Sequence, residues 1–349
     1  MHIISPEEIK PGMKLARTIY REEDGGVLLR PNIELKPSYI TRIQELKYNH
    51  LYILDRGDAE DRIIYDYIDD ETRFNARWLL KKTFKLLEGN PSVNLRNISN
   101  IVETMIDQLY SKLDFVGHAV IDIRTIENYI FGHSVNVCII ALMLGADLGL
   151  NRMELAKLGI GALLHDVGLF LGESKNWEKN NPANLQDFDP VKAHPRIGYE
   201  ILKQKTELNF LAAHIALQHH EREDGAGYPR GLTTKRIHRF AKIAAVADDF
   251  DTMVYRGYSK GMAPYQAIQE LRARAGVKYD RPVTDSLVRI MALYPVGSIL
   301  ELNNGETVVV EFVSRFQCRV KALEGPDPGR VYDLYQTPQV KVVKYRIQA

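Results

Sequence analysis

The middle of the chain carries the hydrophobic pattern of a helical domain. From about Thr72 to Leu293, apolar residues recur with the period of an α-helix. Residues 129–148 are apolar nearly throughout and stop at Gly149, which is typical of a buried helix. Asn151 and Glu154 form a capping-box pattern, so the next helix should begin there and end near His165-Asp166. Other helices are expected at Arg73–Leu87, Ile98–Leu113, Pro195–Lys203, Leu208–His219, Arg239–Met253, Pro264–Ala275 and Pro282–Leu293.

The two ends of the chain show shorter apolar runs, which predict small units that contain strands. Near the N-terminus, Met13–Tyr20, Val27–Leu29 and Leu51–Leu54 suggest strands, with a helix opening at Pro37. Near the C-terminus, Asn304-Gly305 between two apolar runs predicts a hairpin, and alternating segments follow it. We therefore predict a mainly α protein in three parts. These are a small mixed α/β unit at residues 1–56, a helical domain at 57–294, and a small β-barrel-like unit at 295–349.

Composition and charge exclude several classes of protein. Lys+Arg is 46 and Asp+Glu is 45, so no whole-chain basic field favours duplex nucleic acid. The two cysteines, Cys138 and Cys318, are too far apart in sequence to suggest a disulfide framework or a thiolate metal site. The first residues lack the apolar core of a signal peptide, and the apolar run Val137–Ala146 is too short to span a bilayer. We expect a cytoplasmic protein without membrane contact.

Histidines and aspartates gather in the helical domain, where helices are expected to end or to be buried. A neutral imidazole offers one lone pair to a metal ion, and a carboxylate can bridge two ions. Five imidazoles and two carboxylates are too many for one tetrahedral site, so they predict two ions that share a carboxylate, a device suited to phosphoryl displacement. One such histidine alone is more often a core or surface residue, but the whole set favours a metal site. Its members are His133, His165, Asp166, His194, His219, His220 and Asp248.

The order of these residues carries a family resemblance. The H…HD…D arrangement resembles the HD phosphohydrolase superfamily. His194-Pro195, His219-His220-Glu221-Arg222 and the run Asp224-Gly225-Ala226-Gly227-Tyr228-Pro229 resemble its HD-GYP branch, and they occur in the family order within residues 131–293. The resemblance implies an HD-type helical domain that hydrolyses cyclic di-GMP or a related cyclic dinucleotide.

The resemblance also implies roles for single residues. One ion would be held by His133, His165, Asp166 and Asp248, and Asp166 would bridge to a second ion held by His194, His219 and His220, although the division of the histidines stays open. His165 and Asp166 would be the catalytic residues, and Asp251 resembles an aspartate that orients a ligand. Gly225, Gly227, Tyr228 and Pro229 would form a rigid loop that also contacts a protein partner. Arg256 matches an arginine that contacts phosphate and Lys260 lies nearby, with a solvated-surface role equally supported for both. The ligand chemistry suits two divalent transition-metal ions, Fe or Mn first and then Zn, Co or Ni.

Three positions depart from the family pattern. Tyr129 stands where relatives with three metals have a Glu ligand, which favours two ions here. Leu169 replaces a lysine that faces the substrate phosphate in relatives, which weakens the expectation of efficient catalysis but not of metal binding. The stretch Arg256-Gly257-Tyr258 lacks the family's proline, which leaves the position of Arg256 open.

The expected function is a metal-dependent phosphodiesterase that converts cyclic di-GMP, or a related cyclic dinucleotide, to a linear dinucleotide and further to GMP. Two alternatives stay open. The first is a catalytically weak HD-GYP receptor that binds a cyclic dinucleotide or a signalling partner, which Leu169 favours. The second is an HD phosphohydrolase for another nucleotide. The remaining expected partner is a second copy of the chain.

Overall fold

The computed structural model describes residues 2–4, 6–21, 26–46, 48, 51–54, 67–90, 92–112, 129–171, 190–207, 210–254, 262, 264–291, 294, 298–313 and 317–346. Ile68–Ser111 and Asn128–Leu287 form one compact unit, which is helical. The protein is mainly helical, as the hydrophobic period predicted. The helices of this unit are α2 (Asp70–Gly89), α3 (Arg96–Tyr110), α4 (Tyr129–Asp147), α5 (Arg152–Leu163), α6 (Val167–Phe170), α7 (Pro190–Lys205), α8 (Phe210–Gln218), α9 (Arg239–Val254), α10 (Pro264–Ala273) and α11 (Arg281–Ile290).

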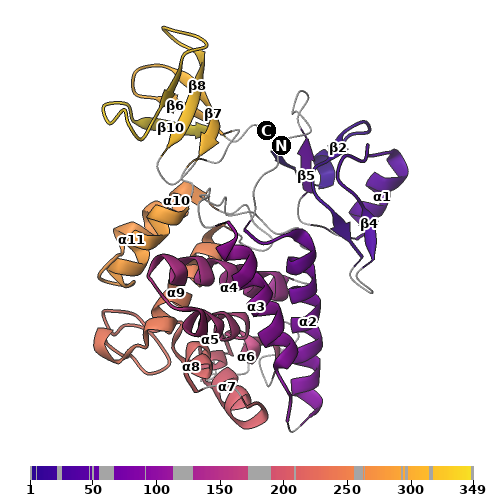
Figure 1. Ribbon diagram of the computed structural model, residues 1–349, viewed down its shortest axis with the longest axis vertical. Helices are drawn as coiled ribbons and strands as arrows, with labels where there is room; N and C mark the ends of the chain where they lie inside the picture. Colours follow the sequence, from indigo (N-terminus) through magenta and orange to yellow (C-terminus); the bar gives the residue numbers. More distant parts are fainter. Residues whose placement is uncertain are drawn as a thin grey trace, which may run out of the picture. The chain divides into compact units, whose positions relative to one another are not determined.

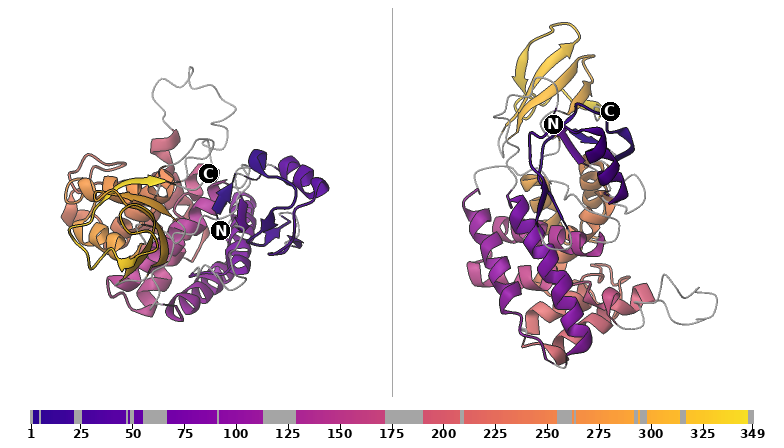
Figure 2. Two further views of the ribbon diagram at one scale, coloured as in Figure 1. Left: turned by 90° about the horizontal axis from the view of Figure 1, so that it is seen from above. Right: turned by 90° about the vertical axis from the view of Figure 1, so that its right-hand side faces the viewer.

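The apolar helix α4 lies at the centre of this unit. It packs against α2, α3, α5 and α9, and Figures 1 and 2 show α2 and α3 side by side next to it. The stretch Ile130–Asp147 is long and apolar enough to cross a membrane, yet 83% of it is buried within the protein. Its hydrophobicity is therefore accounted for by the core of the helical unit.

Local sequence signals fix several helix ends. Asn151 and Glu154 form the predicted capping box at the start of α5, with both side chain to backbone distances at 3.0 Å. After α5 ends, His165-Asp166 occupies a turn, and the short helix α6 follows directly. Phe170 of α6 packs against Phe84 and Phe131, with ring centroids 5.4 and 5.5 Å away, which anchors α6 to α2 and α4.

Helix α7 begins earlier than the sequence predicted. It starts at Pro190 rather than Pro195, so Pro195 lies inside the helix. His194, expected just before a helix, therefore projects from within one. The helix expected at Leu208–His219 runs from Phe210 to Gln218 and leaves His219-His220 immediately after it.

The N-terminal residues form a small mixed α/β unit, as expected. The strands β1 (His2–Ile4), β5 (Leu51–Leu54) and β2 (Lys14–Leu15) make an antiparallel sheet in that order. A second pair joins β3 (Ile19–Tyr20) to β4 (Val27–Leu29), and α1 covers Pro37–Glu45. Leu15, Ile43 and Leu51 are among the fully buried side chains of its core.

The C-terminal residues form one antiparallel sheet with the order β10-β6-β7-β8-β9 (Figure 1). The predicted hairpin joins β6 (Ile299–Leu302) to β7 (Thr307–Val313), with Gly305 at a φ of +83°. The other strands are β8 (Cys318–Glu324), β9 (Val331–Asp333) and β10 (Val342–Arg346). Among the described strands no pairing joins β9 to β10, so the sheet is open and the barrel-like form expected from the sequence is not what the structure has. The two domain boundaries predicted at residues 56 and 294 stay predictions.

Candidate metal centre

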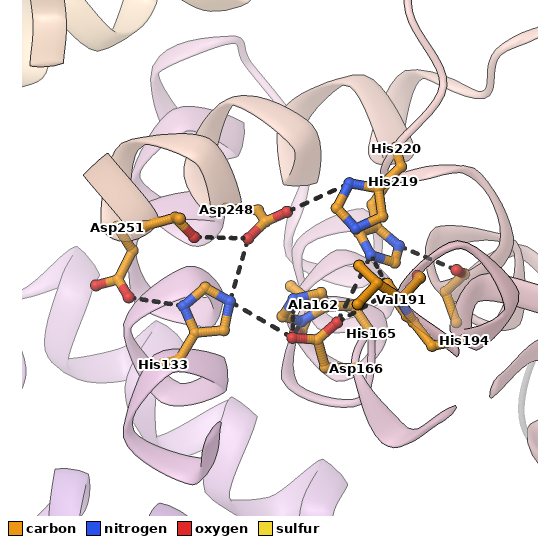
Figure 3. A network of polar contacts seen from close by, with 12 residues as sticks. His133, Ala162, His165, Asp166, Val191, His194, His219, His220, Asp248 and Asp251 are labelled. Atoms are coloured by element: carbon orange, nitrogen blue, oxygen red, sulfur yellow. Dashed lines mark hydrogen bonds and ion pairs between the residues drawn. The ribbon is translucent and has the colours of Figure 1, made fainter. Parts of the chain in front are cut away.

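Seven histidine and aspartate side chains from five elements of the helical unit converge on one point (Figure 3). All but His220 are buried, with at most 6% of each residue exposed. The convergence includes every metal ligand that the sequence predicted: His133 from α4, His165 and Asp166 from the turn after α5, His194 from α7, His219 and His220 from the end of α8, and Asp248 from α9.

Close contact between α6 and α7 brings His194 to this point. A Cβ at Gly168 would collide with the backbone carbonyl of His194 and would lie 2.7 Å from the backbone nitrogen of Gly198. Only a residue without a side chain allows the two helices to approach so closely. Gly168 therefore places the His165-Asp166 turn beside the middle of α7.

The Nδ1 atoms of three imidazoles donate to backbone carbonyls that have no N–H partner within their own helix. His165 Nδ1 lies 2.7 Å from the carbonyl oxygen of Ala162 at the end of α5, and His219 Nδ1 lies 2.9 Å from that of Ala216 at the end of α8. A carbonyl can accept only from an N–H, so the proton is on Nδ1 in each ring. The Nε2 atom of each ring then carries a lone pair toward the centre of the cluster.

Pro195 creates the acceptor for the third imidazole. A residue at position 195 would normally donate its backbone N–H to the carbonyl of Val191, but proline has no N–H. His194 Nδ1 lies 2.5 Å from that carbonyl oxygen instead. The His-Pro pair therefore sets the tautomer of His194 through a local break in the helix ladder.

His133 is oriented by a carboxylate rather than a carbonyl. Its Nδ1 lies 2.7 Å from Asp251 Oδ2, so Nε2 faces Asp248 Oδ1 at 3.1 Å. Asp248 and Asp251 are three residues apart on α9 and share one face of the helix. The aspartate expected to orient a ligand is thus in contact with His133.

The two oxygens of Asp166 face different pairs of histidines. Oδ2 lies 3.2 Å from His165 Nε2 and 3.6 Å from His133 Nε2. Oδ1 lies 3.3 Å from His194 Nε2 and 3.7 Å from His219 Nε2. Asp248 also faces both sides, because its Oδ2 is 3.9 Å from His220 Nδ1. Asp166 thus presents one oxygen to each of two pairs of imidazole nitrogens.

The lone pairs of this cluster fit metal ions. His194 Nε2 and His219 Nε2 lie 3.1 Å apart, although neither nitrogen carries a proton in the tautomers set by their carbonyl partners. Two imidazole nitrogens bound at right angles to one ion, each at about 2.1 Å, would be about 3 Å apart. His165 Nε2 is fully buried and makes no hydrogen bond in the described part of the chain. Cations placed among these nitrogens would give each of the three lone pairs a partner.

Charge in the cluster is also matched to cations. Burial lowers the pKa of His133, but hydrogen bonds to Asp248 and Asp251 outweigh burial and raise it to about 10. Burial opposes charge on Asp166 as well, yet His165 and His194 hold its pKa well below the usual range. Burial and the neighbouring His220 lower the pKa of His219 far below its ordinary value, so this imidazole is neutral, as a ligand must be.

The loop that carries the Gly-Tyr-Pro sequence is held rigidly beside the cluster. The carboxylate of Glu221 is buried and accepts from the backbone N–H of Arg230 at 2.8 Å and of Leu232 at 2.7 Å. A Cβ at Gly227 would lie 2.5 Å from the Arg222 nitrogen, so only glycine fits against that backbone. The ring of Tyr228 stacks on His220 with centroids 4.7 Å apart. Gly225 has a φ of +77°, and the bond to Pro229 is cis.

A cavity of about 180 Å³ opens next to His219 and His220. The Gly-Tyr-Pro loop forms one wall, and Asp249, Lys278 and Tyr279 form another. Lys278 Nζ lies 2.8 Å from Asp249 Oδ2. The sequence reasoning missed Lys278 and Tyr279, because they follow α10 at a distance from every motif and only the fold brings them here.

Arg256 and Lys260, the expected substrate contacts, are outside the described residues. Leu169 lies in α6, half-buried, and its backbone N–H donates to the Asp166 carbonyl at 2.9 Å. Tyr129 is the first residue of α4. Asn136, which contacts Asp251, was missed, although a buried amide three residues after His133 in an apolar helix was a signal for it.

Comparison with known proteins agrees with this site. The HD domain family matches residues 120–283. A cyclic di-GMP phosphodiesterase of Pseudomonas aeruginosa is 31% identical over 193 residues, which is 55% of this chain and 46% of the relative. A cyclic di-GMP phosphodiesterase response regulator of Xanthomonas campestris pv. campestris is 36% identical over 152 residues, which cover 43% of this chain and 40% of that protein.

Two other comparisons extend this result. A 3'3'-cGAMP-specific phosphodiesterase of Vibrio cholerae is 26% identical over 248 residues, covering 69% of this chain and 45% of that protein. Among solved structures, an HDG"Y"P protein of Bdellovibrio bacteriovorus shares the fold, with a TM-score of 0.51, 17% identity, and coverage of 82% of this chain and 97% of that one. The chain spans less than half the length of the curated relatives it matches.

Proposed function

We propose that the protein, whose residues 120–283 match the HD domain family, is a metal-dependent phosphodiesterase that hydrolyses cyclic di-GMP. The product is the linear dinucleotide, which the same site can cut again to GMP. The proposal covers two divalent transition-metal ions for each chain, Fe or Mn first, held by the seven residues of the cluster.

The carboxylate of Asp166 carries this proposal. Each of its oxygens faces a separate pair of imidazole nitrogens, at 3.2 and 3.6 Å on one side and 3.3 and 3.7 Å on the other. The ligands on one side of Asp166 would hold one ion, and these are His133, His165 and Asp248. The ligands on the other side would hold the second ion, and these are His194, His219 and His220. With a single ion, the imidazole nitrogens on one side of Asp166 would keep buried lone pairs that bind nothing.

When bound, such ions supply an activated water and neutralise charge on the phosphate. The residues of this chain do the rest by position. Carbonyl partners keep His165, His194 and His219 in one tautomer, and Asp251 does the same for His133. The rigid loop and the cavity beside His220 leave room for part of the dinucleotide next to the ligands, with the Lys278 ammonium in the cavity wall.

The test is turnover and metal content measured on one sample. The full chain, purified without oxygen and loaded with Mn or Fe, should contain about two ions and should linearise cyclic di-GMP. Asp166→Ala is the matched control and should do neither. If the metal-loaded wild type cleaves neither cyclic di-GMP, nor 3'3'-cGAMP, nor another cyclic dinucleotide, the proposed phosphodiesterase activity is refuted.

Two observations support alternatives, one to the proposed activity and one to the proposed substrate. Leu169 lacks the cation that this position has in HD-GYP relatives, which favours a receptor that binds the cyclic dinucleotide with slow turnover. The similarity to 3'3'-cGAMP-specific phosphodiesterases makes 3'3'-cGAMP the second substrate to assay. Binding without cleavage, measured by calorimetry with both dinucleotides, separates the receptor from the enzyme.

We place the protein in the cytoplasm, where cyclic dinucleotides signal. Its two buried free thiols, Cys138 and Cys318, would stay reduced there. The exposed side of the Gly-Tyr-Pro loop is the proposed contact for a protein partner, and a second copy of the chain is the proposed assembly. Arg256 and Lys260 are proposed as phosphate contacts.

A further inference from the structure

A chain of buried polar side chains leads away from the metal centre to helix α2. Arg73 Nη1 donates to Asn136 Oδ1 at 3.0 Å, and Asn136 Nδ2 donates to Asp251 Oδ1 at 2.7 Å. Asp251 Oδ2 in turn accepts from His133 Nδ1 at 2.7 Å, as drawn in Figure 3. None of the four residues is more than 4% exposed. Arg73 and its helix lie outside the segment that matches the HD domain family.

Stability alone does not account for this arrangement. A buried guanidinium and a buried carboxylate each lose hydration of several kcal/mol, and well-packed apolar residues often replace such groups with no loss of stability. The neutral amide of Asn136 joins Arg73 to Asp251, with one hydrogen bond on each side.

The amide makes the chain directional. Arginine has only donors, so it accepts nothing from Asn136 and must face the amide oxygen. The amide NH₂ then has to face Asp251. If the amide were flipped, its oxygen would point at the carboxylate and its NH₂ at the guanidinium, and both contacts would be repulsive. Arg73 therefore decides which way Asn136 faces.

The orientation of Asn136 decides what Asp251 can do for His133. With Oδ1 occupied by the amide, the carboxylate is held in one rotamer and presents Oδ2 to His133 Nδ1. That contact fixes the ring plane and leaves Nε2 directed at Asp248 and Asp166. Asp251 would thus contact a metal ligand without binding the metal itself. Replacing a residue of this kind typically changes metal affinity or activity about 10–100-fold.

We propose that Arg73 and Asn136 are positioning residues that fix His133 for metal binding, through Asp251. The proposal rests on the metal centre of the proposed function and adds an arginine from a helix that precedes the HD domain segment. Arg73 also donates from Nε to the carbonyl of Ile68 at 3.2 Å, so the chain of bonds is anchored at the first residue of the helical unit.

The experiment measures Mn(II) affinity of the full chain by chelator competition, together with the melting temperature of the metal-free protein. Arg73→Met should weaken Mn(II) binding about 10–100-fold and also lower the metal-free melting temperature, because the Ile68 carbonyl and Asn136 Oδ1 lose this donor. Arg77→Met is the matched control, because Arg77 is buried on the same helix one turn further along, with its guanidinium over Phe74. It should alter stability without that loss of affinity.

A double-mutant cycle tests the connection itself. Arg73→Met and Asp251→Asn should each weaken Mn(II) binding, and the double variant should be no weaker than the worse single variant, because both act through His133. Additive losses, equal losses in Arg77→Met, or full Mn(II) affinity in Arg73→Met would each overturn the proposal. If Arg73→Met does not fold, Asn136→Leu with Asp251→Asn provides the same cycle. Wild type that binds Mn(II) but cleaves nothing would refute the proposed function and leave this result interpretable.

Discussion

At the scale of single residues, Asp166 places one carboxylate oxygen beside each half of the cluster. It follows His165 directly in the turn after α5, and its two oxygens point to opposite halves of the cluster. An amide of the same shape would have one oxygen and one NH₂, so it could serve only one side. The identity of this one carboxylate therefore controls both halves of the centre.

Replacing Asp166 should empty both halves of the site. Asp166→Ala is expected to lose most of the bound metal, measured by plasma emission spectrometry on desalted protein, because the shared ligand is gone. Asp166→Asn should retain part of one ion only. Full metal content in Asp166→Ala would show that Asp166 does not bridge.

Leu169 is the residue at which the charge of the site departs from the HD-GYP pattern that the sequence resembles. It is half-buried in α6, three residues after Asp166. A preorganised electrostatic contact of this kind is typically worth about 10²–10³-fold in rate. Leu169→Lys should therefore raise the rate on cyclic di-GMP with unchanged metal content.

A packing role for Leu169 would give a different result. A lysine there would lower the melting temperature because its ammonium would lose hydration. Rate and melting temperature are read on the same preparation. A stable, fully metallated Leu169→Lys that is no faster contradicts the electrostatic explanation.

At the scale of elements, the ends and breaks of helices set the chemistry of the ligands. Three imidazoles use carbonyls left over by the ends of α5 and α8 or by Pro195 in α7. Close approach at Gly168 then brings two of these elements together. The helices thus fix both where the imidazoles lie and which nitrogen is free.

Pro195 offers a test in which stability and metal binding move in opposite directions. Pro195→Ala restores an N–H for the Val191 carbonyl and should stabilise α7 by up to about 3 kcal/mol. The restored bond competes with His194 Nδ1, so metal affinity should fall about 10–100-fold. Pro264→Ala, at the start of α10, should leave affinity unchanged. Equal or tighter metal binding by Pro195→Ala would argue against this role for the proline.

Gly168 can be tested in the same way. Gly168→Ala forces α6 and α7 apart, because its Cβ would meet backbone atoms that cannot move independently. It should destabilise the protein by about 1–3 kcal/mol and reduce metal content. Gly89→Ala, whose Cβ would have no atom within 4 Å, is the control and should be close to neutral. Normal metal content in a folded Gly168→Ala protein would show that the position of His194 does not depend on the close contact between α6 and α7.

At the scale of the whole molecule, the candidate ligands and their positioning residues all belong to the helical unit. Every one lies within Ile68–Ser111 or Asn128–Leu287. The N-terminal unit and the C-terminal sheet have hydrophobic cores of their own, built from residues such as Leu15 and Val308. Nothing in the ligand set requires either of them.

Residues 57–294 should therefore bind metal without the terminal units. Metal content and circular dichroism of this fragment are compared with those of the full chain, and any change in turnover measures how the terminal units tune activity. A fragment that is helical by circular dichroism yet stays metal-free in excess Mn(II) would refute a site confined to the helical unit.

Local patterns in the sequence predicted the helical class, the candidate metal-ligand residues and the order of the motifs. These follow from local properties: the helical period of apolar residues, the capping box at Asn151, and histidines next to helix ends. The hairpin at Gly305 was predictable for the same reason, because its turn depends on two adjacent residues.

How these groups face one another depends on contacts between helices that are distant in sequence. The lone pairs of His194 and His219, 3.1 Å apart, belong to residues 25 positions apart. The path from Arg73 to His133 contains bonds between residues 63 and 118 positions apart on separate helices. Whether the C-terminal strands close into a barrel also depended on pairing between distant strands, and the described strands leave the sheet open. Local sequence sets what each element can offer, while contacts between elements, which depend on packing of the whole unit, set what each side chain meets.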